Sequence, residues 1–237
     1  MSRRFTTVPL IIVTITAAIL VACGTRPPPP SAPVVKSTGD PITISFDDMP
    51  VDQAPVGFRC AWPGPEGVKP ARWIIKYLTD SPNMRVLIQA DGDDTNHRYP
   101  VALYDGKRFG DVRVGVRAQA VSGERDRSFG VVVRAVDERN YYVARANTSG
   151  WGENVRFYKF VDGKRSELDE WQGPIAPNAW HRLEIEAVGS VFSVSLDGKH
   201  IFRVKDETFP AAGQVGVWTK AEAISRFDDL TITSVTP

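Results

Sequence analysis

Alternating apolar and polar residues run through most of the chain and predict a protein built of β-strands. Val191–Leu196 (VFSVSL) and residues 200–204 (HIFRV) alternate with a period of two around Asp197-Gly198-Lys199. Asp-Gly between two such runs is a strong signal for a tight hairpin turn. No segment shows the sustained 3.6-residue period of a long helix. We expect further strands at residues 71–78, 85–89, 111–120, 129–135, 141–146, 155–161, 180–187, 213–219 and 227–233.

The spacing of these strands predicts the architecture. Many short strands separated by turn residues are typical of a β-sandwich or a β-barrel. The Asp-Gly-Lys triplet recurs at residues 105–107 and 162–164, and no internal repeat of fixed period is apparent. Residues 41–237 contain no low-complexity break, and their length suits one all-β domain. We therefore predict a single sandwich or barrel domain over this range.

The first 22 residues have a different pattern. Arg3 and Arg4 precede an uncharged apolar run over residues 8–22, and small residues lead to Cys23. These are the parts of a secretory signal. A transmembrane helix is the alternative, but about 15 uncharged residues fall short of the roughly 20 that span a bilayer. We interpret residues 1–22 as a signal peptide.

The junction at Cys23 resembles the lipobox of bacterial lipoproteins. That resemblance implies cleavage before Cys23, acylation of Cys23 by diacyl and N-acyl groups, and attachment to the lipid bilayer of the cell envelope. Stable anchoring needs more than one acyl chain, a condition that this modification meets. By the same resemblance, Gly24 at the next position implies the outer membrane. Residues 25–40 (TRPPPPSAPVVKSTGD) are rich in proline and small residues, so we expect residues 23–40 to form an extended tether.

Charge and cysteine content exclude several classes of function. Removing residues 1–22 takes away Arg3 and Arg4 and no acids, which leaves 27 basic and 28 acidic side chains. This balance creates no field that attracts polyanions, so we do not expect a nucleic-acid partner. With Cys23 acylated, Cys60 is the only thiol and cannot form an intrachain disulfide. We expect Cys60 to be a buried, unreactive side chain.

Five segments of the chain carry a family resemblance. They are FDDMPVDQAPVGF, GVVVRAVDERNYYVARAN, NVRFYKFVDGKR, WHRLEIEAVGSVFSVSLDGKHIF and VGVWTKAEAISRFDDLTI. On these segments the chain is similar to the concanavalin A-like lectin/glucanase superfamily over almost all of residues 42–235, and within it to bacterial domains related to the 3-keto-disaccharide hydrolase branch. The resemblance implies a jelly roll of two antiparallel sheets, one concave and one convex, with any ligand in the concave groove. Fold alone does not decide function.

Strand alternation suggests which residues line that groove. With Val131, Val133, Val215 and Val217 facing the core, their neighbours in sequence face the opposite side. Tryptophan with polar donors is the chemistry that sugar rings select, and we expect neighbouring glycines to leave space over the tryptophan ring. The alternative is that these side chains pair across strands for structural reasons. The candidate ligand-binding residues are Arg134, Arg145, Asn147, Trp218 and Lys220.

Catalytic signatures are mostly absent. The chain lacks the Glu-x-Asp-x-Glu motif of family 16 glycoside hydrolases, which supplies paired carboxylates. Residues 167–170 (ELDE) have the wrong spacing, and Glu184 and Glu186 suit a solvated strand face. We predict a non-catalytic module that binds a glycan or another envelope component, and a glycoside hydrolase acting on disaccharides or related glycans is the alternative. Two carboxylates within roughly 10 Å in the groove would favour hydrolysis.

One loop concentrates oxygen ligands. Residues 91–97 (DGDDTNH) could bind Ca²⁺ through Asp91, Asp93 and Asp94. The loop lacks the full EF-hand spacing, and aspartate, glycine and asparagine favour turns without a metal. The three histidines are scattered and form no zinc pattern. We therefore predict no metal site and no cofactor, and Ca²⁺ at this loop is the alternative.

Overall fold

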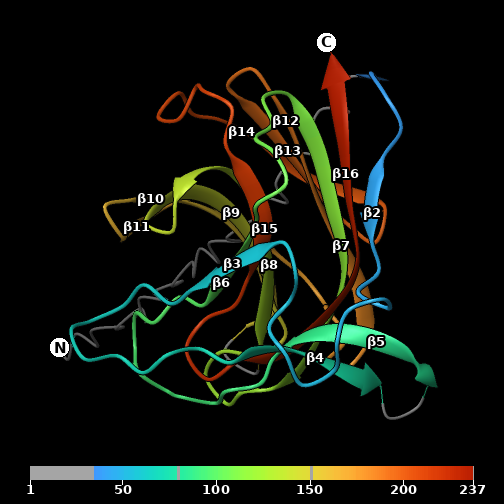
Figure 1. Ribbon diagram of the computed structural model, residues 1–237. Coiled ribbons are helices and arrows are strands. Elements are labelled where there is room, and N and C mark those ends of the chain that lie inside the picture. The colour runs from blue at the N-terminus through green and yellow to red at the C-terminus, as the bar shows by residue number, and fades with distance from the viewer. Residues whose placement is uncertain (1–34, 79–80, 150–151, 237) are drawn as a thin grey trace, which may run out of the picture.

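The computed structural model describes residues 35–78, 81–149 and 152–236. The predicted signal peptide, Cys23 and most of the predicted tether lie outside these residues. Every regular element in the described part of the chain is a β-strand, and each strand pairing is antiparallel (Figure 1). The same residues include no apolar helix long enough to cross a membrane. The strands are β1 (Lys36–Ser37), β2 (Ile42–Ile44), β3 (Phe58–Ala61), β4 (Trp73–Leu78), β5 (Ser81–Gln89), β6 (Val101–Tyr104), β7 (Val112–Ser122), β8 (Ser128–Asp137), β9 (Asn140–Asn147), β10 (Asn154–Val161), β11 (Lys164–Gln172), β12 (Trp180–Val188), β13 (Val191–Leu196), β14 (Lys199–Lys205), β15 (Gln214–Trp218) and β16 (Ile224–Thr236).

These strands form two sheets. The nine-stranded sheet has the order β14-β13-β12-β7-β16-β5-β4, with β1 and β2 also paired to β16. The seven-stranded sheet has the order β11-β10-β9-β8-β15-β6-β3. β7 and β8 follow each other in sequence but lie in different sheets, so the chain crosses the sandwich there (Figure 1). The predicted sandwich of two antiparallel sheets is confirmed.

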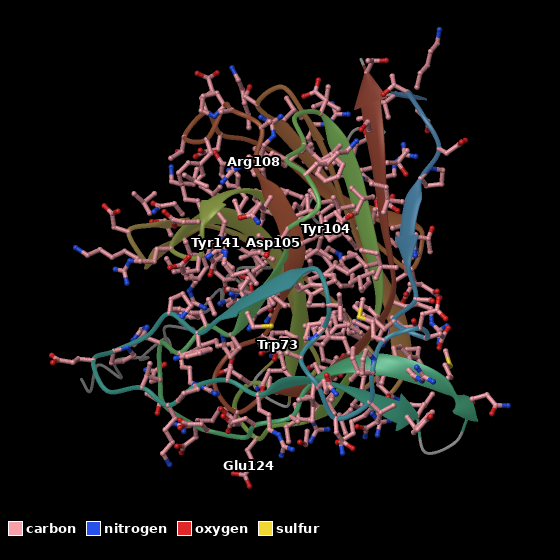
Figure 2. The ribbon with its side chains drawn as sticks, viewed as in Figure 1. Trp73, Tyr104, Asp105, Arg108, Glu124 and Tyr141 are labelled. Atoms are coloured by element: carbon pink, nitrogen blue, oxygen red, sulfur yellow. The ribbon has the colours of Figure 1, made fainter. Side chains whose placement is uncertain are left out.

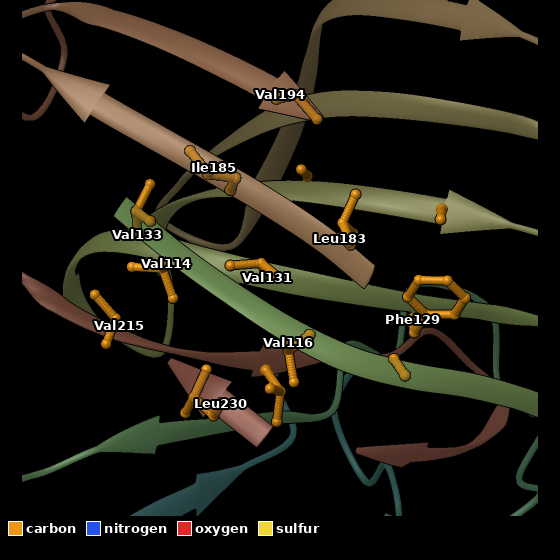
Figure 3. Packing of buried hydrophobic residues seen from close by; sticks show 14 of the residues in the cluster. Val114, Val116, Phe129, Val131, Val133, Leu183, Ile185, Val194, Val215 and Leu230 are labelled. Atoms are coloured by element: carbon orange, nitrogen blue, oxygen red, sulfur yellow. The ribbon is translucent and has the colours of Figure 1, made fainter. Parts of the chain in front are cut away.

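The main core lies between the sheets. Val131 and Val133 from the seven-stranded sheet pack with Val114 and Val116 from the nine-stranded sheet (Figure 3). Val215 and Val217 are also fully buried in this cluster, so the predicted inward face of β8 and β15 is correct. Full burial of a valine or leucine side chain contributes about 1.5–3 kcal/mol. Apolar side chains fill the interior, whereas Glu124 points outward at the periphery (Figure 2).

A second cluster lies on the other face of the seven-stranded sheet, which we call its outer face. Tyr141, Phe160 and Trp218 project from β9, β10 and β15 and are buried there. Tyr99, from the segment before β6, stacks on Trp218 with ring centroids 5.9 Å apart. Tyr141 and Trp218 each adjoin a residue of the main core in sequence, Tyr142 and Val217, as the two-residue period of a strand requires. Side chains that alternate along these strands thus form a core on each face of the seven-stranded sheet.

Two Asp-Gly turns shape the sheet edges. Asp197 and Gly198 join β13 to β14, and Asp162 and Gly163 join β10 to β11, all with positive φ. Positive φ at both central residues is the signature of a type I′ hairpin, which aspartate and glycine tolerate. The third triplet, at residues 105–107, follows β6 but joins no hairpin, since β6 and β7 lie in different sheets.

The folded domain begins earlier than the sequence suggested. Lys36 and Ser37 belong to the predicted tether, but they pair with Thr236 and Val235 at the end of β16. The chain ends of the described region therefore lie side by side. Lys36 and Ser37, which the sequence assigned to the tether, are therefore part of the nine-stranded sheet.

Candidate functional site

A row of residues crosses the outer face of the seven-stranded sheet and leads to a pocket. Arg145 on β9 lies opposite Gly130 on β8 and opposite Arg156 on β10. Gly130 in turn pairs with Trp218 on β15. At one end of the outer face, these strands and their adjoining loops surround a pocket of about 270 Å³. Its lining is Asp94, Asn96, Arg125, Asp126, Arg145, Asn147, Asn154, Arg156, Tyr158, Arg165, Lys220, Ala221 and Glu222.

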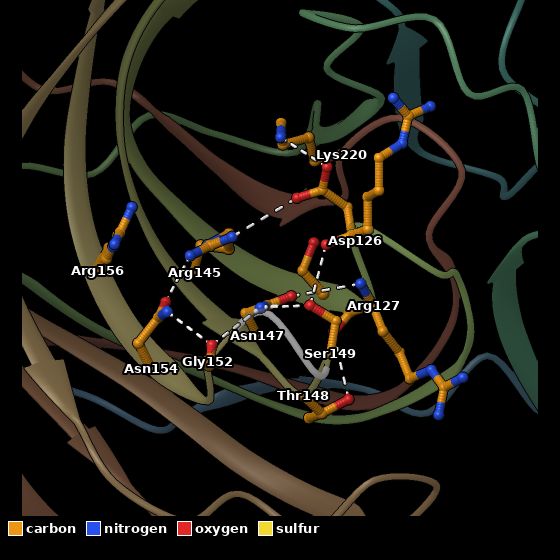
Figure 4. Close-up of polar contacts among 12 residues, drawn as sticks. Asp126, Arg127, Arg145, Asn147, Thr148, Ser149, Gly152, Asn154, Arg156 and Lys220 are labelled. Atoms are coloured by element: carbon orange, nitrogen blue, oxygen red, sulfur yellow. Dashed lines mark hydrogen bonds and ion pairs between the residues drawn. The ribbon is translucent and has the colours of Figure 1, made fainter.

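Arg145 lies at the base of the pocket and is only 5% exposed. Its Nη2 donates to Asn154 Oδ1 at 2.5 Å, and its Nη1 lies 3.7 Å from Asp126 Oδ1. The other oxygen of Asp126 accepts from Lys220 Nζ at 2.6 Å (Figure 4). Burial lowers the pKa of the Arg145 guanidinium, and the neighbouring charges of Tyr158 and Asp126 act in the opposite direction. The Asp126 carboxylate therefore pairs with two cationic side chains, Arg145 and Lys220, and both lie beside the pocket.

Asn147 lines the pocket and also bonds to residues beside it. Its Nδ2 donates to Ser149 Oγ at 2.8 Å and to the Gly152 carbonyl at 3.2 Å, and its Oδ1 accepts from the Arg127 N–H (Figure 4). Asn154 donates to the same Gly152 carbonyl at 2.8 Å. The Asn147 amide is therefore engaged by other residues of the protein, whereas Arg145 and Lys220 present their charges beside the pocket.

Trp218 does not form a sugar-stacking platform, so that expectation is wrong. Its side chain faces the outer side of the sheet as predicted, but it is fully buried. Tyr99 stacks on the ring, and Nε1 donates to Tyr141 Oη at 3.1 Å. Gly130 leaves no space either, because a Cβ there would lie 2.9 Å from the Ala144 carbonyl oxygen and 3.3 Å from the Trp218 ring. The glycine permits close packing of a core tryptophan.

Arg134 also lies away from the pocket. Its φ is +53°, and the register of β8 with β9 shifts between Val133 and Asp137. This bulge breaks the alternation, and the guanidinium donates to Pro210 O at 2.7 Å and to Asp111 Oδ1 at 3.1 Å. Asp111 precedes β7 of the nine-stranded sheet, so Arg134 ties the two sheets together. Of the five predicted ligand-binding residues, the pocket brings together Arg145, Asn147 and Lys220.

Several pocket residues were missed in the sequence. Arg156 and Tyr158 alternate with the core residue Phe157 along β10, so the strand pattern contained the signal that places them on the outer face. Arg165 follows the Asp162-Gly163 turn on a strand that the apolar pattern does not predict. Asp126 lies in a loop, where periodicity carries no information.

Glu222 is a second carboxylate of this site. Its Oε1 accepts from the backbone N–H groups of Arg125 at 2.8 Å and Asp126 at 3.0 Å. Burial raises the pKa of the Glu222 carboxyl, but hydrogen bonds from its own, the Asp126 and the Arg125 N–H groups outweigh burial, so the pKa is lowered. The contact with the Asp126 backbone places the two carboxyl groups within the roughly 10 Å that separates paired catalytic carboxylates. The sequence analysis did not predict Asp126 or Glu222 as site residues.

The other acidic candidates are engaged locally. Asp91 Oδ2 pairs with the buried Arg98 at 2.6 Å, and Asp93 Oδ1 accepts from the Thr95 N–H and hydroxyl. In the described part of the chain, no three histidine, cysteine, aspartate or glutamate side chains gather as a metal site. Glu186 on β12 pairs with Arg113 at 2.6 Å, so this face of the nine-stranded sheet carries ion pairs.

The fold is similar to that of several solved structures. The carbohydrate-binding module CBM66 from Bacillus subtilis superposes with a TM-score of 0.58 and 22% identity, over 75% of this chain and 96% of the module. Domain 4 of the arabinanase AbnA from Geobacillus stearothermophilus, solved in complex with arabinotriose, gives 0.51 and 12%, over 84% of this chain and 93% of that domain. These likenesses confirm the predicted concanavalin A-like jelly-roll sandwich.

One curated protein is related in sequence. The levanase of Bacillus subtilis (strain 168) is 28% identical over 148 residues, which is 62% of this chain. The match spans 19% of the levanase. No family model matches the chain.

Proposed function

We propose that this protein binds a carbohydrate in the pocket around Arg145, Asp126 and Lys220, without catalysis. The observation that carries the proposal is the chain of contacts among these three residues, which places cationic donors and a carboxylate acceptor side by side in one pocket. Sugar hydroxyls both donate and accept hydrogen bonds, and hydrogen bonds to charged groups contribute about 1.5–3 kcal/mol each. The names of two fold relatives, a carbohydrate-binding module and a domain holding arabinotriose, support the same function.

The polar contacts within the pocket suit a binding site. Arg145 contacts Asn154 and Asp126 in the absence of a ligand, and Asn147 bonds to Gly152. Groups fixed in advance lose little conformational entropy on binding. Since Trp218 is unavailable, recognition relies on hydroxyl contacts with charged and amide groups.

The amino-terminal pattern supports the rest of the proposal. A signal peptide over residues 1–22, the acylated Cys23 and the proline-rich segment would attach the sandwich to the envelope of a bacterial cell, at the outer membrane. The tether would then confine the binding domain close to that membrane, which raises its effective concentration toward glycans there. We therefore describe the protein as an envelope lipoprotein with a glycan-binding sandwich.

A glycoside hydrolase is the second candidate, and the proximity of Asp126 and Glu222 together with the levanase match favours it. Hydrolysis needs a carboxylic acid that keeps its proton at the working pH, which requires a raised pKa. The lowered pKa of Glu222 and the ion pairs of Asp126 do not suit this role. Binding without release of reducing sugar supports the binding function, whereas turnover that Glu222→Gln abolishes supports the hydrolase.

A glycan array with the full chain in neutral detergent tests the proposal. We expect binding to a defined set of glycans and at least tenfold weaker binding by Lys220→Gln or Arg145→Gln, because each substitution removes a charged hydrogen-bond donor. Lys205→Gln is the matched control, since Lys205 is exposed on β14 of the other sheet. Thermal melting establishes that each variant is folded. An array without ligands, or variants that bind like the parent, contradicts the proposal.

A further inference from the structure

Three arginines from consecutive strands surround one tyrosine in the pocket. Arg145, Arg156 and Arg165 belong to β9, β10 and β11, and Tyr158 lies among them on β10. The Arg165 Cζ lies 4.5 Å from the centre of the Tyr158 ring, and the Arg145 Cζ lies 5.9 Å from it. Arg156 also interacts with Tyr158. Three positive charges therefore meet at one side of the pocket.

Two of these arginines have carboxylate partners. Arg156 pairs with Glu170 at 2.7 Å and with Glu167 at 3.4 Å, both across the β10–β11 pairing. Arg145 lies 3.7 Å from Asp126, whose carboxylate is shared with Lys220. Arg156 is neutralised, whereas Arg145 and Lys220 divide a single negative charge.

Arg165 differs from both. Its contacts in the described part of the chain are with two aromatic rings, Tyr158 at 4.5 Å and Tyr99 at 5.7 Å, and no carboxylate there lies within ion-pair distance. Aromatic faces hold a guanidinium in place and leave its charge uncancelled. With Arg156 neutralised by Glu167 and Glu170, the residues lining the pocket carry four other basic groups and three acidic groups, a formal excess of one positive charge.

Two buried atoms of the pocket residues lack a hydrogen-bond partner within the described residues, Arg145 Nε and Glu222 Oε2. The Nε of Arg145 is buried and makes no hydrogen bond within the described residues, in a side chain that is 5% exposed. The positive charges of Arg156 and Arg165 also act on Arg145 and lower its pKa, after the larger effects of burial and of the opposing charges of Tyr158 and Asp126. An anion placed among these groups would relieve that repulsion.

We propose that the saccharide bound in this pocket is acidic and that its carboxylate lies against Arg165 and Arg145. This inference rests on the proposed glycan-binding function and specifies its ligand class, a uronic acid or another carboxylated sugar. The planar guanidinium matches the geometry of a carboxylate and binds it through two parallel N–H···O bonds. The rings of Tyr99 and Tyr158 hold Arg165 in one plane for that contact, and Lys220 and Asp126 remain for the hydroxyl groups.

The test compares matched ligands on one array with the full chain in neutral detergent. Each uronic-acid oligosaccharide is printed beside its carboxyl-reduced counterpart, which has the same linkages but a neutral CH₂OH group. We expect the acidic member of at least one pair to bind at least tenfold more tightly than the reduced member. The preference should weaken between 0.05 M and 0.5 M NaCl, because salt screens partly exposed charges.

Substitution of Arg165 locates the preference. Arg165→Gln should bind the acidic and reduced members equally, and Arg165→Lys should keep part of the preference, because a lysine retains the charge but lacks the planar fork. Lys205→Gln, which removes a positive charge from the other sheet, should bind like the parent. Equal binding of both members by the parent, or an Arg165→Gln variant that still prefers the acid, overturns the inference.

The outcomes separate this inference from the function on which it rests. Ligands confined to neutral glycans overturn the acidic ligand class and leave glycan binding intact. An array without any ligand overturns both.

Discussion

Replacement of Trp218 by alanine should destabilise the fold, because the side chain belongs to the second core. The ring is fully buried, packs with Tyr99 and Phe160, and donates to Tyr141 Oη at 3.1 Å. Large aromatic-to-alanine changes in a core cost about 3–5 kcal/mol. The orphaned Tyr141 hydroxyl adds about 1–3 kcal/mol, since it stays buried without its partner. The expected loss of about 4–8 kcal/mol is comparable to the whole stability of many domains.

A milder substitution keeps the experiment quantitative. Trp218→Phe retains an aromatic ring and removes the hydrogen bond to Tyr141, so we expect a loss of about 1–3 kcal/mol. For a domain of this size that corresponds to roughly 2–12 °C in Tm. Tyr77→Ala is the control, since Tyr77 is 51% exposed and its ring lies beside the Arg85 guanidinium, a cation–π contact at the surface. We expect that control to melt within a few degrees of the parent.

Unfolding in guanidinium chloride, monitored by far-ultraviolet circular dichroism, measures these changes in stability. Glycan binding is measured separately on the folded protein. Trp218→Phe should bind glycans like the parent, because the ring lies under Tyr99 and outside the pocket lining. A Trp218→Ala protein as stable as the parent would refute the assignment of Trp218 to the core. Selective loss of glycan binding at unchanged stability would restore the sugar-stacking hypothesis.

Three further predictions concern single residues. Burial raises the pKa of the Asp228 carboxyl to about 6, and the charges of Asp229 and Asp47 add to the effect. The folded state therefore holds this proton more tightly than the unfolded state does. As a result, the free energy of unfolding falls as the pH rises from about 4 to about 6. Asp228→Asn should therefore be more stable than the parent by about 1–3 kcal/mol at pH 7.5 and equal to it at pH 4 in urea unfolding, and no difference at pH 7.5 would contradict the shift. Burial, followed by the charge of Asp105, raises the pKa of the half-buried Cys60 thiol to about 12. A thiol reagent should therefore label the native protein slowly and the denatured protein quickly. Rapid labelling of the native protein would contradict this prediction. Cys23→Ala should leave the precursor uncleaved and unlabelled by radioactive palmitate, and a labelled variant would disprove acylation at Cys23.

The sequence predicted most of the strands that carry an apolar pattern, but it missed β6 (Val101–Tyr104), which is short and apolar, as well as the short strands β2 and β3. Val191–Leu196 matches β13, and most other predicted ranges differ from the observed strands by a few residues at their ends. The strand at Lys164–Gln172 was missed because it forms a sheet edge, where the residues KRSELDEWQ are largely polar. Charged edge strands discourage pairing with other chains, so they lack the apolar signal of an interior strand.

The site was only partly predictable, for three physical reasons. Arg134 lies in a bulge with positive φ, and strand periodicity does not reveal such a break. Trp218 faces the predicted side, but Tyr99 arrives from a loop and covers it. Asp126 reaches the pocket from another loop, and its pairing with Arg145 and Lys220 depends on contacts distant in sequence. Alternation thus predicts the face of a strand, but it does not predict what covers that face.

The central claim is that a carbohydrate binds in the pocket at the end of the seven-stranded sheet, and a crystal structure of the protein with a glycan selected from the array tests it most directly. We predict electron density for the sugar within hydrogen-bond distance of Arg145, Lys220 and Asp126, with the loop at Asn147 unchanged. A glycan found on the outer face of the nine-stranded sheet, or at a surface remote from Arg145, would contradict the account.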